Sequence, residues 1–315
     1  MCYIYSAFDN INTATGQLAF VPAFKQHPVL AHLNCSAFFN PESEAYKTYS
    51  EVKIIDPERL PMECKDIRDR GNFVTRVYDE ERDFPLAFAR ATYTDYIFQE
   101  SELSANYNPN NVYCYVLDSK ADDTFKHRMR ALGKCFGNVI VAHKEFNMHA
   151  GGENIIPAQQ HCLELLLGRR FKYVVIMENF DMLIKTNYEL VRIFQVYNGS
   201  NDASAQSSNA LYGGRKDFAE KSDWSLKNLQ IFRNTSLNSP DIKLVPVKSL
   251  TQSAFSYEAV YHMFNVLNLN ELINKLNGGG FNQELFTGMV NANEVLKLPG
   301  GFTTKCLDET YSLAR

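Results

Sequence analysis

Apolar runs that alternate with amphipathic segments begin near Phe84 and continue through most of the remaining chain. The run Tyr173–Met177 is apolar at every position, which is typical of a strand covered on both faces. Comparable runs predict further strands at residues 85–91, 112–117, 138–142 and 244–248. Helical spacing predicts helices at residues 94–106, 120–134, 155–167, from about 188, 256–268, 270–276 and 283–291. This alternation with short loops predicts an α/β domain with a mostly parallel, Rossmann-type sheet flanked by helices.

Two regions lack this alternation. Residues 1–83 contain many turn signals and only two candidate short helices, at 43–54 and 61–70, so we interpret them as an N-terminal extension that packs on a main domain of residues 84–315. Residues 199–223 are polar and rich in Gly and Ser, which predicts a long mobile loop, and loops of that length often carry function.

Polar side chains follow the predicted strands at the edge where open α/β sheets bind ligands. Glu178 and Asp181 follow the strand that ends at Met177, although a core strand ending in a turn explains them equally well. Thr186 and Asn187 are suited to cap the next helix.

Asp118 ends the strand at 112–117 and is followed by Ser119 and Lys120. A carboxylate there can accept hydrogen bonds from a ribose or base, and Ser and Lys can contact phosphate. The physical alternative, which we favour from the residues alone, is an N-cap of the following helix. Asp122 and Asp123 are better explained as negative charge at that helix N-terminus. No Asp-x-Asp ends a strand, so the sequence contains no evident divalent-metal clamp.

Two further stretches carry weaker signals. The loop 149–154 (HAGGEN) is a poor phosphate motif without a P-loop lysine, and Glu153 or Asn154 is suited to cap the helix after it. Glu284 is predicted in the first turn of a helix behind the glycines 278–280. A favourable contact with the helix dipole explains a first-turn Glu without any catalytic role.

Composition narrows the function classes. The 315 residues are 45% hydrophobic, enough for a full core, and the net charge of −4 gives no electrostatic reason to expect nucleic acid. No apolar run approaches the roughly 18 residues of a membrane span, and the first residues do not resemble a signal peptide. The seven cysteines form no CxxC pair and no zinc spacing. Sequons at Asn34, Asn198 and Asn234 weakly favour the secretory pathway.

Several stretches together resemble one family. They are residues 84–88 (FPLAF), 107–118 (YNPNNVYCYVLD), 135–142 (CFGNVIVA), 160–162 (QHC), 181–187 (DMLIKTN), 282–286 (NQELF) and 298–300 (LPG). Their order and spacing resemble the core-2/I-branching β-1,6-N-acetylglucosaminyltransferases, whose wider group includes the protein xylosyltransferases. The resemblance implies a GT-A-like domain in the Golgi lumen of a type II membrane protein, although no anchor or signal is visible in this chain. It also implies inverting, metal-independent and cofactor-free transfer of N-acetylglucosamine from UDP-N-acetylglucosamine to a 6-hydroxyl of a glycoprotein glycan.

The resemblance assigns roles by position. Glu284 falls on the catalytic base, and Ile184 lies close to the acceptor, with Asp181 organising that side and its turn. The expected donor contacts are Ala91, Thr92, Tyr93, Asp118, Ser119 and Lys120. The implied disulfides are Cys64–Cys135 and Cys114–Cys162.

The chain also departs from the family pattern. The Arg and Lys that bind the diphosphate in the family fall beyond the position of Arg315, as does the usual partner of Cys35, for which Cys306 is a possible substitute. The residues 150–154 replace an aromatic-rich loop of the family. The alternative functions are therefore a catalytically inactive glycan-binding or scaffold homologue, and a xylosyltransferase-type donor specificity.

Overall fold

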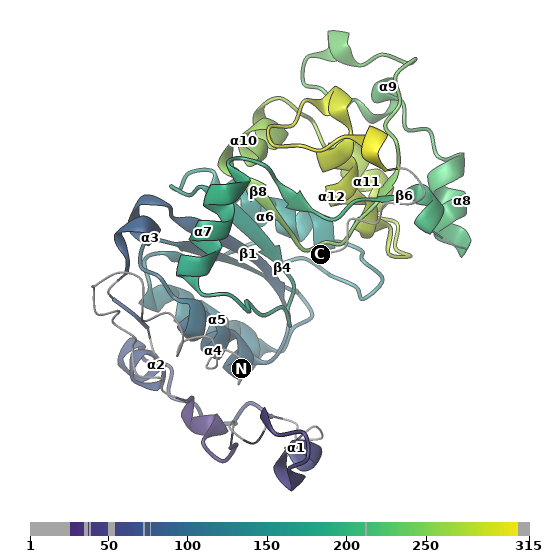
Figure 1. Cartoon of the computed structure of the whole chain (residues 1–315). Coiled ribbons are helices and arrows are strands. Elements are labelled where there is room, and N and C mark those ends of the chain that lie inside the picture. The colour runs from purple at the N-terminus through teal and green to yellow at the C-terminus, as the bar shows by residue number, and fades with distance from the viewer. Residues whose placement is uncertain are drawn as a thin grey trace.

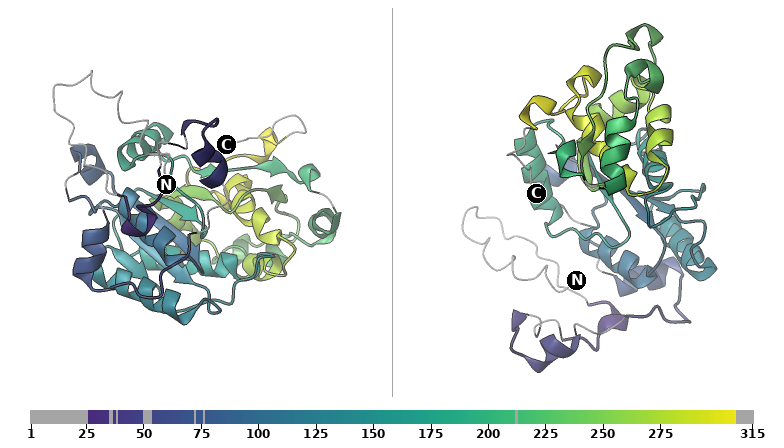
Figure 2. Two further views of the ribbon diagram at one scale, coloured as in Figure 1. Left: turned by 90° about the horizontal axis from the view of Figure 1, so that it is seen from below. Right: turned by 90° about the vertical axis from the view of Figure 1, so that its right-hand side faces the viewer.

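The computed structural model describes residues 26–307, apart from residues 35, 36, 38, 50–53, 72, 76 and 212. In this part of the chain, helices cover both faces of a central sheet (Figure 1). The arrangement confirms the α/β class and the mostly parallel sheet that the apolar runs predicted. The purple and blue elements of the first part of the chain lie toward one end of the molecule, and the green to yellow elements α9 to α12 lie toward the other end (Figure 1 and Figure 2).

The central sheet has six strands in the order β3-β2-β1-β4-β8-β5. Strands β1 to β4 are mutually parallel, whereas β8 runs antiparallel to both of its neighbours. A separate antiparallel pair is formed by β6 and β7. The strands are β1 (Leu86–Thr92), β2 (Val112–Leu117), β3 (Val139–Val141), β4 (Tyr173–Met177), β5 (Asp202–Ala203), β6 (Gln206–Ser207), β7 (Val247–Lys248) and β8 (Ser253–Ser256).

The register of the parallel strands brings three chain segments to one edge. Thr92 of β1 pairs with Leu117 of β2, and Arg90 of β1 pairs with Met177 of β4. The residues that follow β1, β2 and β4 therefore lie side by side at the carboxyl edge of the sheet. This is the edge where open α/β sheets bind their ligands.

Helices connect the strands. The α-helices are α1 (Glu44–Tyr49), α2 (Cys64–Arg70), α3 (Asp79–Asp83), α4 (Tyr96–Asn106), α5 (Asp123–Cys135), α6 (Ile155–Leu166), α7 (Asn187–Tyr197), α8 (Gly213–Lys221), α9 (Leu226–Leu229), α10 (Tyr257–Asn265), α11 (Asn270–Leu276) and α12 (Phe286–Ala292). The 3-10 turns are η1 (Pro28–Leu30), η3 (Ser208–Ala210), η4 (Thr235–Leu237), η5 (Asn282–Leu285), η6 (Glu294–Leu296) and η7 (Thr304–Cys306). None of the helices in the described ranges is long and apolar enough to cross a membrane.

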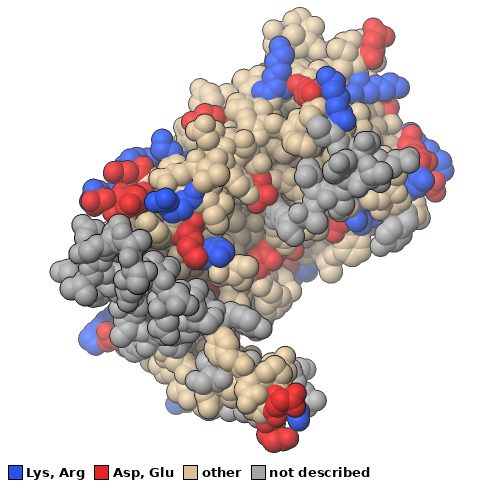
Figure 3. Space-filling view, viewed as in Figure 1, with Lys and Arg blue, Asp and Glu red and all other residues tan. Residues whose placement is uncertain are grey.

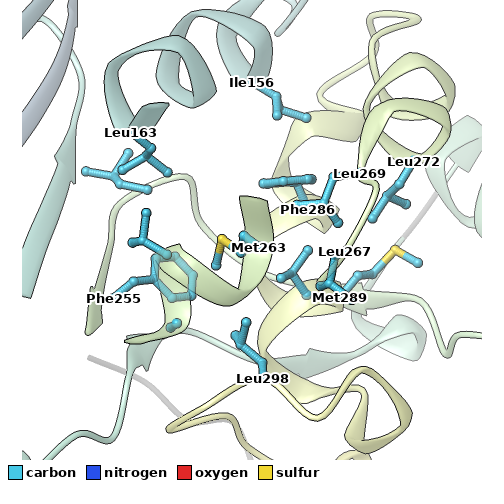
Figure 4. Close-up of a cluster of buried hydrophobic side chains, with 14 of the residues drawn as sticks. Ile156, Leu163, Phe255, Met263, Leu267, Leu269, Leu272, Phe286, Met289 and Leu298 are labelled. Atoms are coloured by element: carbon cyan, nitrogen blue, oxygen red, sulfur yellow. The ribbon is translucent and has the colours of Figure 1, made fainter. Parts of the chain in front are cut away.

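Two hydrophobic cores lie on opposite faces of the sheet. Alternate side chains of β1 point to opposite faces, so Ala87 and Ala89 join one core while Leu86 and Phe88 join the other. In the first core, Ile156 of α6 lies near Phe286 of α12 (Figure 4). The small alanines on β1 leave room for α6 to pack closely on the sheet.

The N-terminal segment is attached to the main domain by specific contacts. The carboxylate of Asp56 accepts hydrogen bonds from the backbone N–H groups of Tyr96 and Ile97, at 2.8 and 3.0 Å. It thereby caps α4, whose own N-cap residue Asp95 makes no side-chain cap bond. The predicted helix at 61–70 is α2, and that at 43–54 is α1, with residues 50–53 outside the described part. The division into an N-terminal extension and a main domain that begins at residue 84 stays a prediction.

Three expectations about the second half of the chain were wrong. Residues 199–223 are not one long loop, because they contain β5, β6 and α8. The strand expected at 244–248 is shortened to β7, and β8 was missed. Strands of two to four residues and a polar helix leave no periodic signal in a sequence, since tertiary contacts decide their structure.

Candidate functional site at the carboxyl edge of the sheet

The first group of predicted donor residues follows β2. The backbone N–H of Asp118 donates to the carbonyl of Thr92 at 2.9 Å, and its buried carboxylate accepts from the N–H of Lys120 at 2.9 Å. Asp118 therefore stabilises its own turn. It does not cap α5, so the N-cap role favoured from the sequence was wrong. Asp122 caps α5, because its side chain accepts from the N–H groups at 124 and 125.

The second group ends β1 and meets the turn after β4. The side-chain oxygen of Asn179 accepts hydrogen bonds from the Thr92 hydroxyl and the Tyr93 N–H, both at 2.7 Å. The Tyr93 ring is 47% exposed and forms an edge contact with the exposed ring of Phe180, with 6.0 Å between ring centroids. The two groups of predicted donor residues, with Ala91 beside them on β1, therefore lie at adjoining strand ends.

A buried arginine, which was not predicted from the sequence, anchors the turn at residues 178–181. Arg90 donates hydrogen bonds to the backbone carbonyls of Glu178, Asn179 and Asp181, at 3.1, 3.2 and 2.7 Å. Its guanidinium also lies 3.0 Å from the carboxylate of Glu102, and both side chains are buried. An arginine inside an otherwise apolar strand therefore fixes the backbone of the predicted acceptor side.

The two carboxylates after β4 have different environments. Asp181 accepts from the Glu178 N–H at 2.7 Å and closes the turn. Glu178 accepts from the Thr251 hydroxyl at 2.7 Å. Burial raises the pKa of the Glu178 carboxyl, and the charges of Asp181 and Glu284 raise it further, against the effect of the Thr251 bond. Ile184, 78% exposed, stands at the entry to α7, which Thr186 caps as predicted.

Glu284 lies in the first turn of a helical segment, as expected, and this turn is the 3-10 helix η5 immediately before α12. Its backbone carbonyl accepts two hydrogen bonds of 2.6 Å, from the N–H and the hydroxyl of Ser249. Its Oε2 is 2.8 Å from Nη2 of Arg215 on α8. Within the described ranges, Oε1 of Glu284 has no hydrogen-bond partner. Arg215 was missed, because one arginine in a polar, glycine-containing stretch carries no sequence signal.

The segment that contains Ser249 and Thr251 joins Glu284 to the turn after β4. Ser249 binds the backbone of Glu284, and Thr251 binds the side chain of Glu178. The Thr287 hydroxyl, at the start of α12, donates to the carbonyl of Leu250 at 2.6 Å. Glu284 and the carboxylates after β4 are therefore parts of one hydrogen-bonded site.

Both implied disulfides are present. Cys64–Cys135 ties α2 to α5 with Cα atoms 5.1 Å apart, and Cys114–Cys162 ties β2 to α6 with Cα atoms 5.7 Å apart. Cys35 lies outside the described residues. Within the described part, no three His, Cys, Asp or Glu side chains form a group that could hold a metal ion. On the face in Figure 3, basic and acidic side chains are interspersed.

The helix-covered, mostly parallel sheet, with polar groups gathered at its carboxyl edge, defines a protein of the Rossmann-type, GT-A-like class. Residues 86–234 match the model of the Branch family, described as Core-2/I-Branching enzyme. Together with the relatives below, this match shows that residues 86–234 are similar to the core-2/I-branching enzymes. Glu284 lies beyond the matched residues.

Curated relatives agree with this placement. The chain is 32% identical over 180 residues to a Homo sapiens N-acetyllactosaminide beta-1,6-N-acetylglucosaminyl-transferase, covering 56% of this chain and 45% of that protein. It is 28% identical over 193 residues to the Mus musculus beta-1,3-galactosyl-O-glycosyl-glycoprotein beta-1,6-N-acetylglucosaminyltransferase 3, covering 57% and 44%. The matches thus span less than half the length of these two relatives.

Proposed function

We propose that this protein is an inverting, metal-independent glycosyltransferase that moves N-acetylglucosamine from UDP-N-acetylglucosamine to a 6-hydroxyl of a glycan. The observation that carries the proposal is Glu284: a carboxylate about three-quarters buried, with one oxygen bound by Arg215 and the other without a partner in the described structure. A general base needs such an available lone pair, held in a fixed direction. The names of the relatives support this type of transfer.

In the proposed reaction, Oε1 of Glu284 takes the proton of the acceptor hydroxyl while the hydroxyl oxygen attacks the anomeric carbon. The new bond from carbon to the acceptor oxygen forms as the bond from carbon to the phosphate oxygen breaks. UDP leaves from the opposite face with the electron pair, which inverts the configuration. Arg215 holds Oε2 and so directs Oε1, and the partly exposed ammonium of Lys120 is a cation suited to the departing phosphate.

The same proposal assigns binding roles. Ala91, Thr92, Tyr93, Asp118, Ser119 and Lys120 bind the donor, and the side of Asp181 and Ile184 receives the acceptor. The exposed rings of Tyr93 and Phe180 provide apolar surface for a sugar or base between these groups. We place the reaction in the Golgi lumen, because an oxidising compartment suits the two disulfides.

The test is transfer of labelled N-acetylglucosamine from its UDP donor to a Galβ1–3GalNAc acceptor, with EDTA present to remove metal ions. We expect transfer by the wild-type protein, and Glu284→Gln to reduce the rate by about 10²–10⁴-fold while UDP still binds in calorimetry. An unchanged rate in Glu284→Gln would remove Glu284 from the base role. UDP-xylose as the donor tests the xylosyltransferase alternative, and absence of transfer from either donor would favour the inactive glycan-binding homologue.

A further inference from the structure

The glycine-containing loop 149–154 does not serve as a cap for α6. Asn154 occupies the N-cap position of α6 without a side-chain cap bond. Instead, its backbone N–H donates to the side chain of Asn277 at 2.6 Å, and the Asn277 amide donates back to the Asn154 side chain at 3.0 Å. The N–H of Phe281 donates to the carbonyl of Gly151 at 2.8 Å. The loop is thus hydrogen-bonded to the segment that leads into Glu284.

Gly152 makes the closest contact in this junction. Its backbone φ of +100° lies in the region that favours glycine. A β-carbon on Gly152 would overlap Oε1 and Cδ of the Gln283 side chain. Gln283 is only 5% exposed. Gln283 and Glu284 are consecutive residues of η5, so Gly152 provides the space that lets this turn approach the loop.

The other end of the loop reaches the predicted donor contacts. The ammonium of Lys120 donates a hydrogen bond to the carbonyl of Met148, immediately before the loop. The backbone from Met148 to Asn154 therefore runs from Lys120, beside the donor strand ends, to the turn that carries Glu284. Because both ends are hydrogen-bonded, a shift of the loop changes the position of Glu284 relative to the donor side.

We propose that the loop 149–154 is a positioning element for Glu284 and that Gly152 is the residue on which this placement depends. The inference rests on the proposed function, since it concerns the placement of the base. A side chain at Gly152 displaces the end of the buried Gln283 side chain. Because Gln283 directly precedes Glu284 in η5, we expect this displacement to shift the carboxylate relative to the acceptor hydroxyl. A displacement of about 1 Å at a reacting group can reduce the rate about 10²-fold.

The test compares kcat, the KM for UDP-N-acetylglucosamine, UDP affinity by calorimetry and the melting temperature for Gly152→Ala and a matched control. Gly199→Ala is that control, because Gly199 has a similar φ of +94° but no atoms within 4 Å of an added β-carbon. Both variants bear the strain of a positive φ, and only Gly152→Ala displaces Gln283. We expect kcat of Gly152→Ala to fall about 10²-fold with donor KM and UDP affinity retained, while Gly199→Ala keeps the wild-type kcat.

A double variant tests the cause. In Gly152→Ala/Gln283→Ala the colliding side chain is removed, so part of the lost kcat should return. If Gly152→Ala does not fold, Asn277→Ala takes its place, because it releases the loop without adding atoms, and it should lower kcat at unchanged UDP affinity. If whichever of these two single variants folds keeps the wild-type kcat, the inference about the loop is wrong, whereas the proposed function still stands. Absence of transfer by the wild-type protein would overturn the proposed function and this inference with it.

Discussion

Arg215 and Glu284 are separated by 69 residues in the sequence, yet their side chains meet in an ion pair of 2.8 Å. Both side chains are about three-quarters buried, with 21% and 25% of their surface exposed. The pair connects α8 to the turn η5. Among the described residues, this leaves Oε1 of Glu284 as the carboxylate oxygen without a hydrogen-bond partner.

Replacing Arg215 by Met should lower kcat about tenfold to 10²-fold, because the carboxylate loses the contact that fixes its direction. UDP affinity should not change, since Arg215 contacts Glu284, the proposed base, and not the proposed donor residues. Lys216→Met is the matched control, because Lys216 pairs with Glu220 at 3.8 Å on the exposed side of the same helix. Steady-state kinetics with calorimetry checks the prediction, and equal kcat values for the two variants would contradict it.

The raised pKa of Glu178 predicts how stability depends on pH. A carboxyl with a raised pKa in the folded state binds its proton more tightly there than in the unfolded chain. Its contribution to stability is fully present below the unfolded pKa of about 4.3 and is lost as the pH rises through the folded pKa. Glu178→Gln removes this loss, so the variant should melt at a higher temperature than the wild type at pH 7. The two melting temperatures should converge below about pH 4.

Glu189 provides the control with the opposite sign. Burial acts to raise the pKa of Glu189, but hydrogen bonds from the Thr186 N–H and hydroxyl and the charge of Lys185 outweigh it, so the pKa is lowered. The stability from Glu189 is therefore present above the unfolded pKa and lost as the pH falls through the folded one. Glu189→Gln should melt below the wild type at pH 7. A Glu178→Gln variant that also melts lower at pH 7 would refute the interpretation of Glu178.

The features predicted correctly are those that a local pattern determines. Continuous apolar runs located β1 to β4, and the residues after β1 and β2 could be placed at one edge because parallel strands end together. No local pattern predicts the role of Arg90, because its hydrogen-bond partners at residues 178–181 follow a strand that is distant in the sequence. Arg215 lies on a polar helix whose position depends on tertiary packing. The family resemblance singled out Glu284, whereas its ion pair with Arg215 and the contact of the preceding residue, Gln283, with Gly152 required the structure.

The Cys114–Cys162 disulfide should contribute strongly to stability, because it joins the central strand β2 to α6 across 48 residues of sequence. Replacing both cysteines with Ala should reduce the free energy of unfolding by about 3–5 kcal/mol, measured by urea denaturation. Mass spectrometry of peptides from the unreduced protein gives an independent check. Free thiols at both positions would show that the bond does not form.

Asn179 joins the two sides of the site, so its removal should affect both stability and donor binding. Its side-chain oxygen accepts hydrogen bonds from the Thr92 hydroxyl and from the N–H groups of Tyr93 and Thr94. Asn179→Ala leaves these donors unpaired and should cost about 2–4 kcal/mol in urea denaturation, because unpaired buried polar groups are expensive. Thr92→Val removes one donor and should cost only about 1 kcal/mol, since the Asn179 oxygen keeps two partners.

UDP affinity should also fall in Asn179→Ala, because the backbone around Tyr93 loses the hydrogen bonds that fix it. Full stability together with wild-type UDP affinity in Asn179→Ala would show that the end of β1 does not depend on this residue.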